Sequence, residues 1–102
     1  MGKEERTGSS LPDFFRHYPK DRDNLNHDLY DNISHGCRWS DLYICLKALE
    51  KEFHAAKDVD KSIFASAHIL NGLKENPNTS KYSIRRWEYL WSHTSEGKSR
   101  AA

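Results

Sequence analysis

The segment from Ser40 to Lys57, SDLYICLKALEKEFHAAK, constrains the fold of this 102-residue chain more strongly than any other. Its larger apolar residues recur at steps of three and four, so they share one face of an α-helix, with Ser40 as the predicted N-cap. The residues of this face are Leu42, Cys45, Leu46, Leu49, Phe53 and Ala56. A second, smaller apolar strip consists of Ile44, Ala48 and Ala55. Two apolar strips on one helix predict two neighbours, inside a bundle or across an interface.

The same periodicity runs through the rest of the chain, where no alternating or β-branched run is long enough to predict a strand. Three further helices are predicted, over residues 23–35, from Asp60 to about residue 70, and from residue 79 or 80 to residue 93. Leu25, Leu29 and Ile33 form the apolar stripe of the first, while Gly72 and Pro77 mark a loop over residues 71–80. The helix after Asp60 is apolar over a wide arc, so we expect it to be the central one.

The two ends of the chain are polar and rich in small residues, which predicts disordered tails over residues 1–10 and 95–102. Between them, residues 11–94 are predicted to form a single domain. The fold class is all-α, a small compact bundle of three to four helices with disordered termini. Only 36% of the residues are apolar, so we expect a thin core built largely from aromatic residues. Trp39 is expected to pack at the junction before the second helix.

The segment LPDFFRHYP, near the start of the predicted domain, leaves two interpretations open. Phe14, Phe15 and Tyr18 are too apolar for a plain tail. They either pack as a strap over the bundle or act as an anchor that binds a partner.

Charge and cysteine content narrow the class of protein. With 16 basic and 15 acidic residues the net charge is +1, without the bias of a typical nucleic-acid binder. The part from Asn78 onward is locally basic, with five basic and two acidic residues. Two cysteines and the lack of a long apolar run favour a reduced, cytoplasmic protein without a membrane span. We therefore expect an intracellular location and no membrane partner.

Neither catalysis nor metal binding is predicted. No glycine-rich phosphate loop, nucleophile elbow or His-Glu metalloprotease motif occurs, so we expect neither an enzyme nor a cofactor. His27, Asp31 and His35 follow a four-residue spacing, with Cys37 shortly after. The outer pair of such a series is about 12 Å apart along a helix, too far to ligate one zinc ion together. A solvated polar face is the expected role of this series.

The sequence KYSIRRWEYLW, residues 81–91, carries most of the functional information. At about 100° per residue its apolar and aromatic residues divide into two faces. The core face contains Ile84, Trp87, Leu90 and Trp91. The opposite face contains Tyr82, Arg85, Arg86 and Tyr89. Because Tyr and Arg dominate binding hot spots, the second face predicts a partner-binding surface, although an ordinary solvated face has the same composition.

The sequence SAHIL followed by YSIRRWE resembles the two helices of a MerR-type DNA-reading unit. In that family a Ser/Thr-Ile-Arg-Arg-Trp run starts the recognition helix, so the resemblance implies DNA binding through Arg85 and Arg86. The predicted connection over residues 71–80 departs from the pattern, because the family joins its helices by a turn of three or four residues. The resemblance covers about 25 residues.

The sequence as a whole predicts a small non-enzymatic protein-binding module, such as an adaptor, an inhibitor or a regulatory subunit. It would bind another protein through the Tyr/Arg face, together with Ile44 and Ala48 of the second strip. Self-association through that strip, giving a homodimer, is a further interpretation. The alternative function is DNA or RNA binding through the same helix and the basic residues Lys98 and Arg100, since rings stack on bases and cations contact phosphates.

Overall fold

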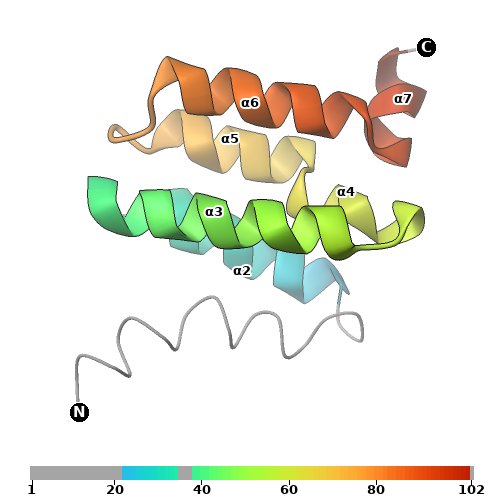
Figure 1. Ribbon diagram of the computed structural model, residues 1–102, viewed down its shortest axis with the longest axis horizontal. Coiled ribbons are helices and arrows are strands. Elements are labelled where there is room, and N and C mark those ends of the chain that lie inside the picture. The colour runs from blue at the N-terminus through green and yellow to red at the C-terminus, as the bar shows by residue number, and fades with distance from the viewer. Residues whose placement is uncertain (1–21, 35–37, 102) are drawn as a thin grey trace.

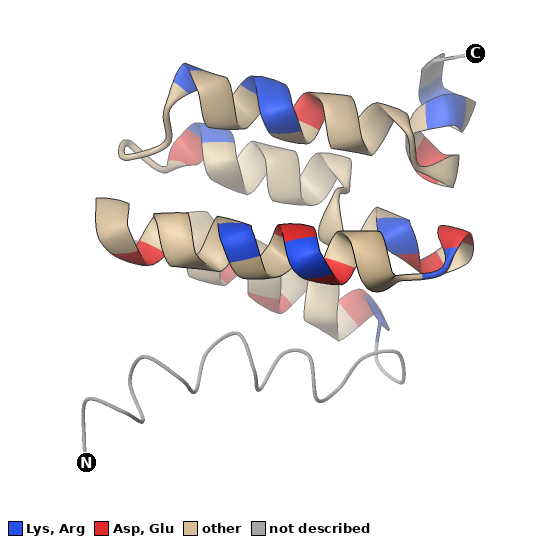
Figure 2. Ribbon diagram, in the orientation of Figure 1, with Lys and Arg blue, Asp and Glu red and all other residues tan. Residues whose placement is uncertain are grey.

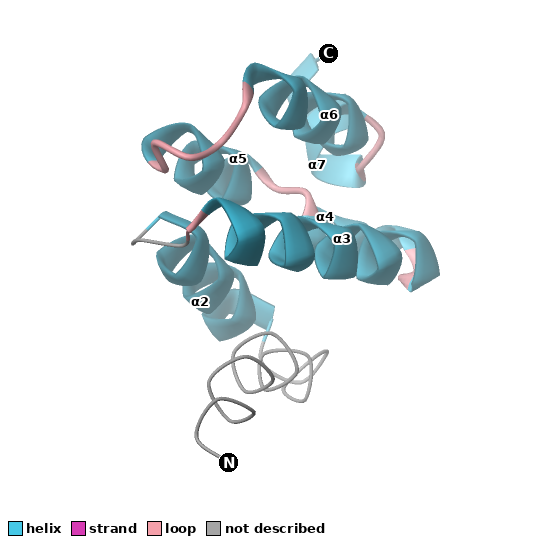
Figure 3. Cartoon of the chain, turned by 60° about the vertical axis from the view of Figure 1, so that its left-hand side comes forward, coloured by secondary structure: helices cyan, strands magenta, loops and turns pink. Residues whose placement is uncertain are grey.

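The computed structural model describes residues 22–34 and 38–101 (Figure 1). In chain order the elements are α2 (Arg22–Ser34), α3 (Trp39–Ala55), the 3-10 helix η1 (Asp58–Asp60), α4 (Lys61–Phe64), α5 (Ala67–Glu75), α6 (Lys81–Ser92) and α7 (Ser95–Ala101). Only helices and loops occur in these two ranges, so the predicted all-α class is confirmed (Figure 3). The predictions for residues 1–21 and 35–37, including Phe14, Phe15, Tyr18 and Cys37, lie outside the described residues.

The core is built from the predicted stripes, but the expectation of a largely aromatic core is wrong, because most of the buried residues are leucine and isoleucine. The three apolar residues of α2, Leu25, Leu29 and Ile33, are all buried. Leu42, Cys45, Leu49 and Phe53 of α3 are buried as well, with Leu46 and Ala56 packed partly against them. Helix α5 contacts α2 and α6, and α4 contacts α2, α3 and α7, so the segment predicted as the central helix touches each of the other α-helices.

The third predicted helix is divided by a break that sequence reasoning did not foresee. Ala65 leaves the helical region (φ −137°, ψ 62°) between α4 and α5. Ser66 then caps α5, because its Oγ accepts a hydrogen bond from the Ile69 backbone N–H at 3.1 Å. The same hydroxyl donates to Asn26 Oδ1 of α2 at 3.2 Å. Ser66 therefore starts a helix and ties it to its main neighbour.

Helix α5 also continues past Gly72, where the sequence predicted a loop. Gly72 is buried, and a Cβ there would lie 3.0 Å from Tyr30 Cδ1 of α2. The glycine thus permits close packing between α2 and α5 and does not end the helix. Next to it, Tyr30 Oη donates to Glu75 Oε1 at 2.7 Å, and this hydrogen bond raises the pKa of Tyr30.

The real end of α5 is Asn76, a buried polar residue. Its Nδ2 donates to the backbone oxygen of Ile33 at 2.6 Å, at the last turn of α2. Its Oδ1 accepts from the backbone N–H of Asn78 at 2.8 Å. One side chain thus closes the turn between α5 and α6 and satisfies a carbonyl at the end of α2.

Residues 95–101, predicted as part of a tail, form helix α7. Thr94 starts it: Oγ1 accepts from the Gly97 backbone N–H at 3.0 Å and donates to the Trp91 carbonyl at 2.7 Å. A Cβ at Gly97 would lie 2.0 Å from that same carbonyl oxygen, so only glycine fits here. The sequence signal was Thr94 with Glu96 and Gly97 nearby, but the segment lacks an apolar stripe.

Two predictions at the start of α3 are wrong. The N-cap is Arg38, without a side-chain capping hydrogen bond, and Ser40 lies inside the first turn. Trp39 does not pack at a junction, because 65% of its surface is exposed. By contrast, α6 begins close to where the sequence predicts, and Ser80 caps it by accepting a hydrogen bond from the Ser83 backbone N–H at 3.1 Å. Within the described ranges, no helix has both the length and the apolar composition needed to cross a membrane.

Candidate partner-binding surface

Helix α6 has the two faces that its sequence predicts. Trp87 and Leu90 are buried in the core, with Ile84 and Trp91 partly buried against it. On the other side Tyr82 is 76% exposed, and Arg85 and Tyr89 are also exposed. The ring of Tyr89 contacts that of His93 with centroids 4.5 Å apart, and His93 Nδ1 lies 2.9 Å from the Tyr89 carbonyl oxygen.

Arg86, the fourth residue of the predicted face, connects α6 to α3. Its guanidinium donates a hydrogen bond to Glu50 Oε2, and His54 Nε2 lies 3.7 Å from the same oxygen. Burial by itself raises the pKa of the Glu50 carboxyl, but the hydrogen bond and the charges of Arg86 and His54 outweigh burial and lower that pKa. The bond to Glu50 in turn raises the pKa of Arg86. Arg86 is thus engaged within the molecule, whereas Arg85 is open to a partner.

A second group of exposed aromatic residues lies on α3, and the sequence reasoning missed it. Trp39 and Tyr43 stack with centroids 5.9 Å apart and planes 12° apart. Lys47 Nζ lies 5.7 Å from the centre of the Tyr43 ring, in the geometry of a cation–π contact. The available signal was the four-residue spacing of these three residues outside the predicted apolar stripe.

The two exposed groups belong to one surface. Helices α3 and α6 run in the same direction in the view of Figure 1, and the Glu50–Arg86 ion pair joins them. We call the outer side of these two helices the α3–α6 surface. It consists of Trp39, Tyr43, Lys47, Glu50 and Lys51 on α3, and of Lys81, Tyr82, Arg85, Arg86 and Tyr89 on α6.

Helical spacing orders this surface into rows, counted outward from the ion pair on each helix. At about 100° per residue, the aromatic side chains project most nearly in the same direction as Glu50 or Arg86, although Trp39 and Tyr43 lie about three and two turns before Glu50 along α3. They are Trp39 and Tyr43 on α3, and Tyr82 and Tyr89 on α6. The cations follow at the outer borders, with Lys47 and Lys51 on one helix and Lys81 and Arg85 on the other. Figure 2 shows basic positions along both helices, interspersed with acidic ones.

The second apolar strip predicted on α3 is only partly exposed. Ile44 is exposed and lies near Lys51 at the border of the surface, whereas Ala48 is partly buried against the core. The strip therefore leaves Ile44 and Ala55 accessible on α3. Its role in an interface, between copies or with a partner, stays a prediction.

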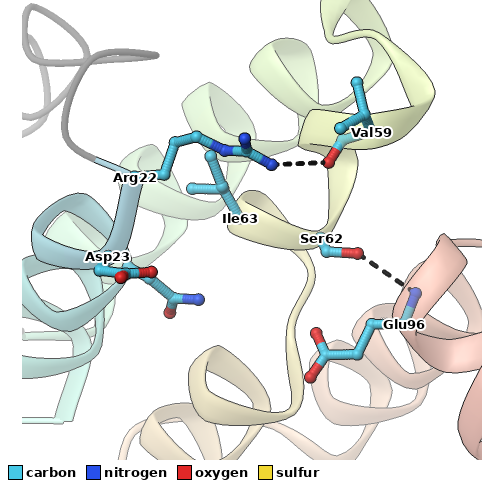
Figure 4. A pocket seen from close by; sticks show the side chains of 7 residues that line it. Arg22, Asp23, Val59, Ser62, Ile63 and Glu96 are labelled. Carbon is cyan, nitrogen blue, oxygen red and sulfur yellow. Dashed lines mark hydrogen bonds between the residues drawn. The ribbon is translucent and has the colours of Figure 1, made fainter.

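A separate pocket of about 430 Å³ lies between α2, the η1–α4 segment and α7 (Figure 4). Arg22 spans one side, donating to the Val59 carbonyl at 3.2 Å and pairing with Asp60 at 3.3 Å. On the other side the Glu96 backbone N–H donates to Ser62 Oγ at 3.4 Å. Asp23, Asn26 and Ile63 complete the lining of the pocket.

The histidine series of α2 forms no described metal cluster. His27 Nε2 lies 3.6 Å from Asp31 Oδ2, and the His27 ring stacks on His68 of α5 with centroids 6.0 Å apart. His35 and Cys37, which a metal site would also use, lie outside the described residues. Over the described ranges, no three His, Cys, Asp or Glu side chains come together as a metal site would require.

Comparison with known proteins returned no match to any family model, curated protein or solved structure. The similarity to a MerR-type unit is therefore not accompanied by a family assignment. The structure shortens the connection that departed from that pattern, because α5 ends at Glu75 and α6 begins at Lys81. Five residues, 76–80, join the two helices instead of the expected ten.

Proposed function

We propose that this chain is a small, non-enzymatic, intracellular protein-binding module, such as an adaptor, an inhibitor or a regulatory subunit, that docks through the α3–α6 surface. The observation that carries this proposal is the exposure of Trp39, Tyr43, Tyr82 and Tyr89 on one side of the molecule. Tryptophan and tyrosine are enriched at binding hot spots because their rings give large contact areas at a small entropic cost.

The core needs none of these four rings, since α3 and α6 already bury other apolar residues. Exposed rings cost solubility and add nothing to the folded core, so their grouping favours a contact with another molecule. Arg85 supports the same reading, because arginine is also a preferred hot-spot residue and this one makes no ion pair with a described residue.

Two features favour a protein over a nucleic acid. The middle of the surface is occupied by the Glu50–Arg86 ion pair, which offers a phosphate backbone no free cation. Arg86, one of the two arginines expected to meet phosphates, already donates to that carboxylate. A protein partner can place a neutral or apolar group over the ion pair, which a polyanion cannot.

Site-specific photocrosslinking in cells tests the proposal. A benzophenone amino acid placed at Tyr82 or at Tyr43 is expected to give a protein adduct of the same mass from both positions. The control is the same amino acid at Asp28, an exposed residue of α2. Equal adducts from Asp28, or none from the two tyrosine positions, would contradict the proposed function.

A further inference from the structure

We propose that the partner of the α3–α6 surface is an acidic amphipathic helix of another protein, with its apolar side on the rings and its carboxylates on the bordering cations. This inference rests on the proposed function and adds the chemistry of the partner. It follows from how the charges of α3 and α6 are paired within the molecule and from the spacing of the exposed rings.

The acidic residues of these helices are mostly neutralised. Glu50 is paired with Arg86, as described, and Asp41 lies 3.7 Å from Arg38. Glu88 lies 3.8 Å from Lys74 of α5. These pairs leave little negative charge to repel an acidic ligand from the α3–α6 surface. The remaining acidic residue of α3, Glu52, lies half a turn from Tyr43, on the other side of that helix.

The cations at the two borders are not neutralised in this way. Lys47, Lys51, Lys81 and Arg85 make no ion pair with any described residue, and Lys47 lies over the Tyr43 ring. The surface is therefore distinctly positive, although the whole chain carries a net charge of only +1. Its local charge complements an acidic partner, and such complementarity sets both specificity and the rate of encounter.

The spacing of the rings favours a helical ligand. Tyr82 and Tyr89 are seven residues apart, about 10 Å along α6, which equals two turns of a partner helix. Trp39 and Tyr43 form a parallel row on α3, one turn apart. Two rows of rings along neighbouring helices match an amphipathic helix that lies lengthwise, with apolar residues at steps of three and four.

A second copy of this chain fits the surface less well. Two such surfaces facing each other would bring Arg85, Lys51 and Lys81 of both copies together without carboxylates to compensate them. Like charges across an interface cost binding energy. The charge pattern thus selects an acidic partner over self-association through this face.

A displayed library of random 16-residue peptides, selected on the full chain, tests this inference. The enriched peptides are expected to be net negative, with apolar residues at helical spacing. Their affinity should fall about tenfold or more in the double variant Lys51→Glu/Arg85→Glu, and it should weaken as salt is added. The matched control is Lys57→Glu/Lys98→Glu, which makes the same change of net charge at exposed residues outside the surface and should bind normally.

Folding of each variant is checked by circular dichroism, with Lys51→Ala/Arg85→Ala as a milder substitute should the charge reversal fail to fold. Enrichment of neutral or basic peptides that still need Tyr82 and Tyr89 would overturn the acidic partner and leave the proposed function standing. Peptides that bind regardless of these tyrosines, or no enrichment at all, would overturn both.

Fluorescence anisotropy with labelled single-stranded DNA and RNA 20-mers completes the experiment. The inference expects weak binding that the surface variant and the control variant change equally. Saturable binding tighter than that of the enriched peptides, and lost only in Lys51→Glu/Arg85→Glu, would replace the acidic helix with a nucleic acid.

Discussion

Trp87 and Trp39 show two opposite uses of the same residue. Trp87, on α6, is 3% exposed and contributes to the core, whereas Trp39, on α3, is 65% exposed and contacts the ring of Tyr43. Burial explains Trp87 completely, because the fold gains stability from every ring removed from water. No such gain explains Trp39. The difference between the two teaches that residue type alone does not separate core from surface in a small aromatic-rich protein.

The largest expected effect is on the stability of the protein, and it tests the comparison of Trp87 with Trp39 directly. Trp87→Ala should lower the free energy of unfolding by about 3–5 kcal/mol, since it removes a buried ring and leaves a cavity. Trp39→Ala should change it by less than about 1 kcal/mol, as is usual for an exposed site. Urea denaturation followed by circular dichroism measures both. A loss of several kcal/mol for Trp39→Ala would show that Trp39 is a structural residue and remove it from the α3–α6 surface.

The next largest loss of stability is expected at Asn76, in the turn between α5 and α6 that we call the corner. Asn76→Ala removes the donor to Ile33 and the acceptor for the Asn78 N–H. Leaving buried polar groups without partners should destabilise the protein by about 2–3 kcal/mol. Asn71→Ala, at an exposed position of α5, is the matched control and should change stability by no more than about 0.5 kcal/mol. Equal losses in thermal denaturation would mean that Asn76 does not hold this corner.

A smaller loss of stability is expected from a substitution at Gly97, where α7 packs against the end of α6. The methyl group of Gly97→Ala would overlap the Trp91 carbonyl oxygen, so α7 must move away from α6. The cost should be about 1–2 kcal/mol. Hydrogen exchange should show loss of protection over residues 95–100, with protection of α3 retained. Ser99→Ala, an exposed change on the same helix, is the control. Unchanged exchange in Gly97→Ala would contradict the tight contact between the two helices.

These elements also show what sequence reasoning could find. The apolar stripes of α2, α3 and α6 could be predicted, because apolar residues at steps of three and four fall on one face of an α-helix. The break at Ala65 could not be predicted, because Ser66 lies in an apolar run that could equally continue as one helix. Its hydrogen bonds to Ile69 and Asn26, seen only in the structure, favour the break. Gly72 was misread for a related reason. A glycine that stops a helix and one that admits a neighbour look alike until the neighbouring Tyr30 is known.

The α3–α6 surface likewise contains residues that the sequence indicates and contacts that only the structure reveals. Tyr82, Arg85 and Tyr89 were identified from their place opposite the core face of α6, which is a property of that helix alone. The pairing of Arg86 with Glu50 depends on how α3 and α6 are placed, and local periodicity contains no such information. Trp39 and Tyr43 could have been identified from their spacing, but the sequence led us to expect an aromatic core, whereas the buried residues are mostly leucine and isoleucine.

The smallest expected effect on stability concerns the ion pair between Glu50 and Arg86. Arg86 lies between the core side and the outer side of α6. Because the pKa of Glu50 is lowered in the folded state, the ionised carboxyl stabilises the fold above its ordinary pKa of 4.5. That contribution is lost as the pH falls through the lowered pKa. Glu50→Gln should therefore be slightly less stable than the wild type at neutral pH, and the difference should shrink as the pH falls below 4.5.

Urea denaturation at a series of pH values measures this difference, and Glu52→Gln is the control, since Glu52 lies on the same helix away from Arg86. The effect is expected to be small because an ion pair that is partly open to water is screened by solvent and salt. A difference that instead grows at low pH would mean that the Glu50 carboxyl is not stabilised by Arg86. Arg86 would then be available, like Arg85, to bind a partner, and the α3–α6 surface would carry one more exposed cation.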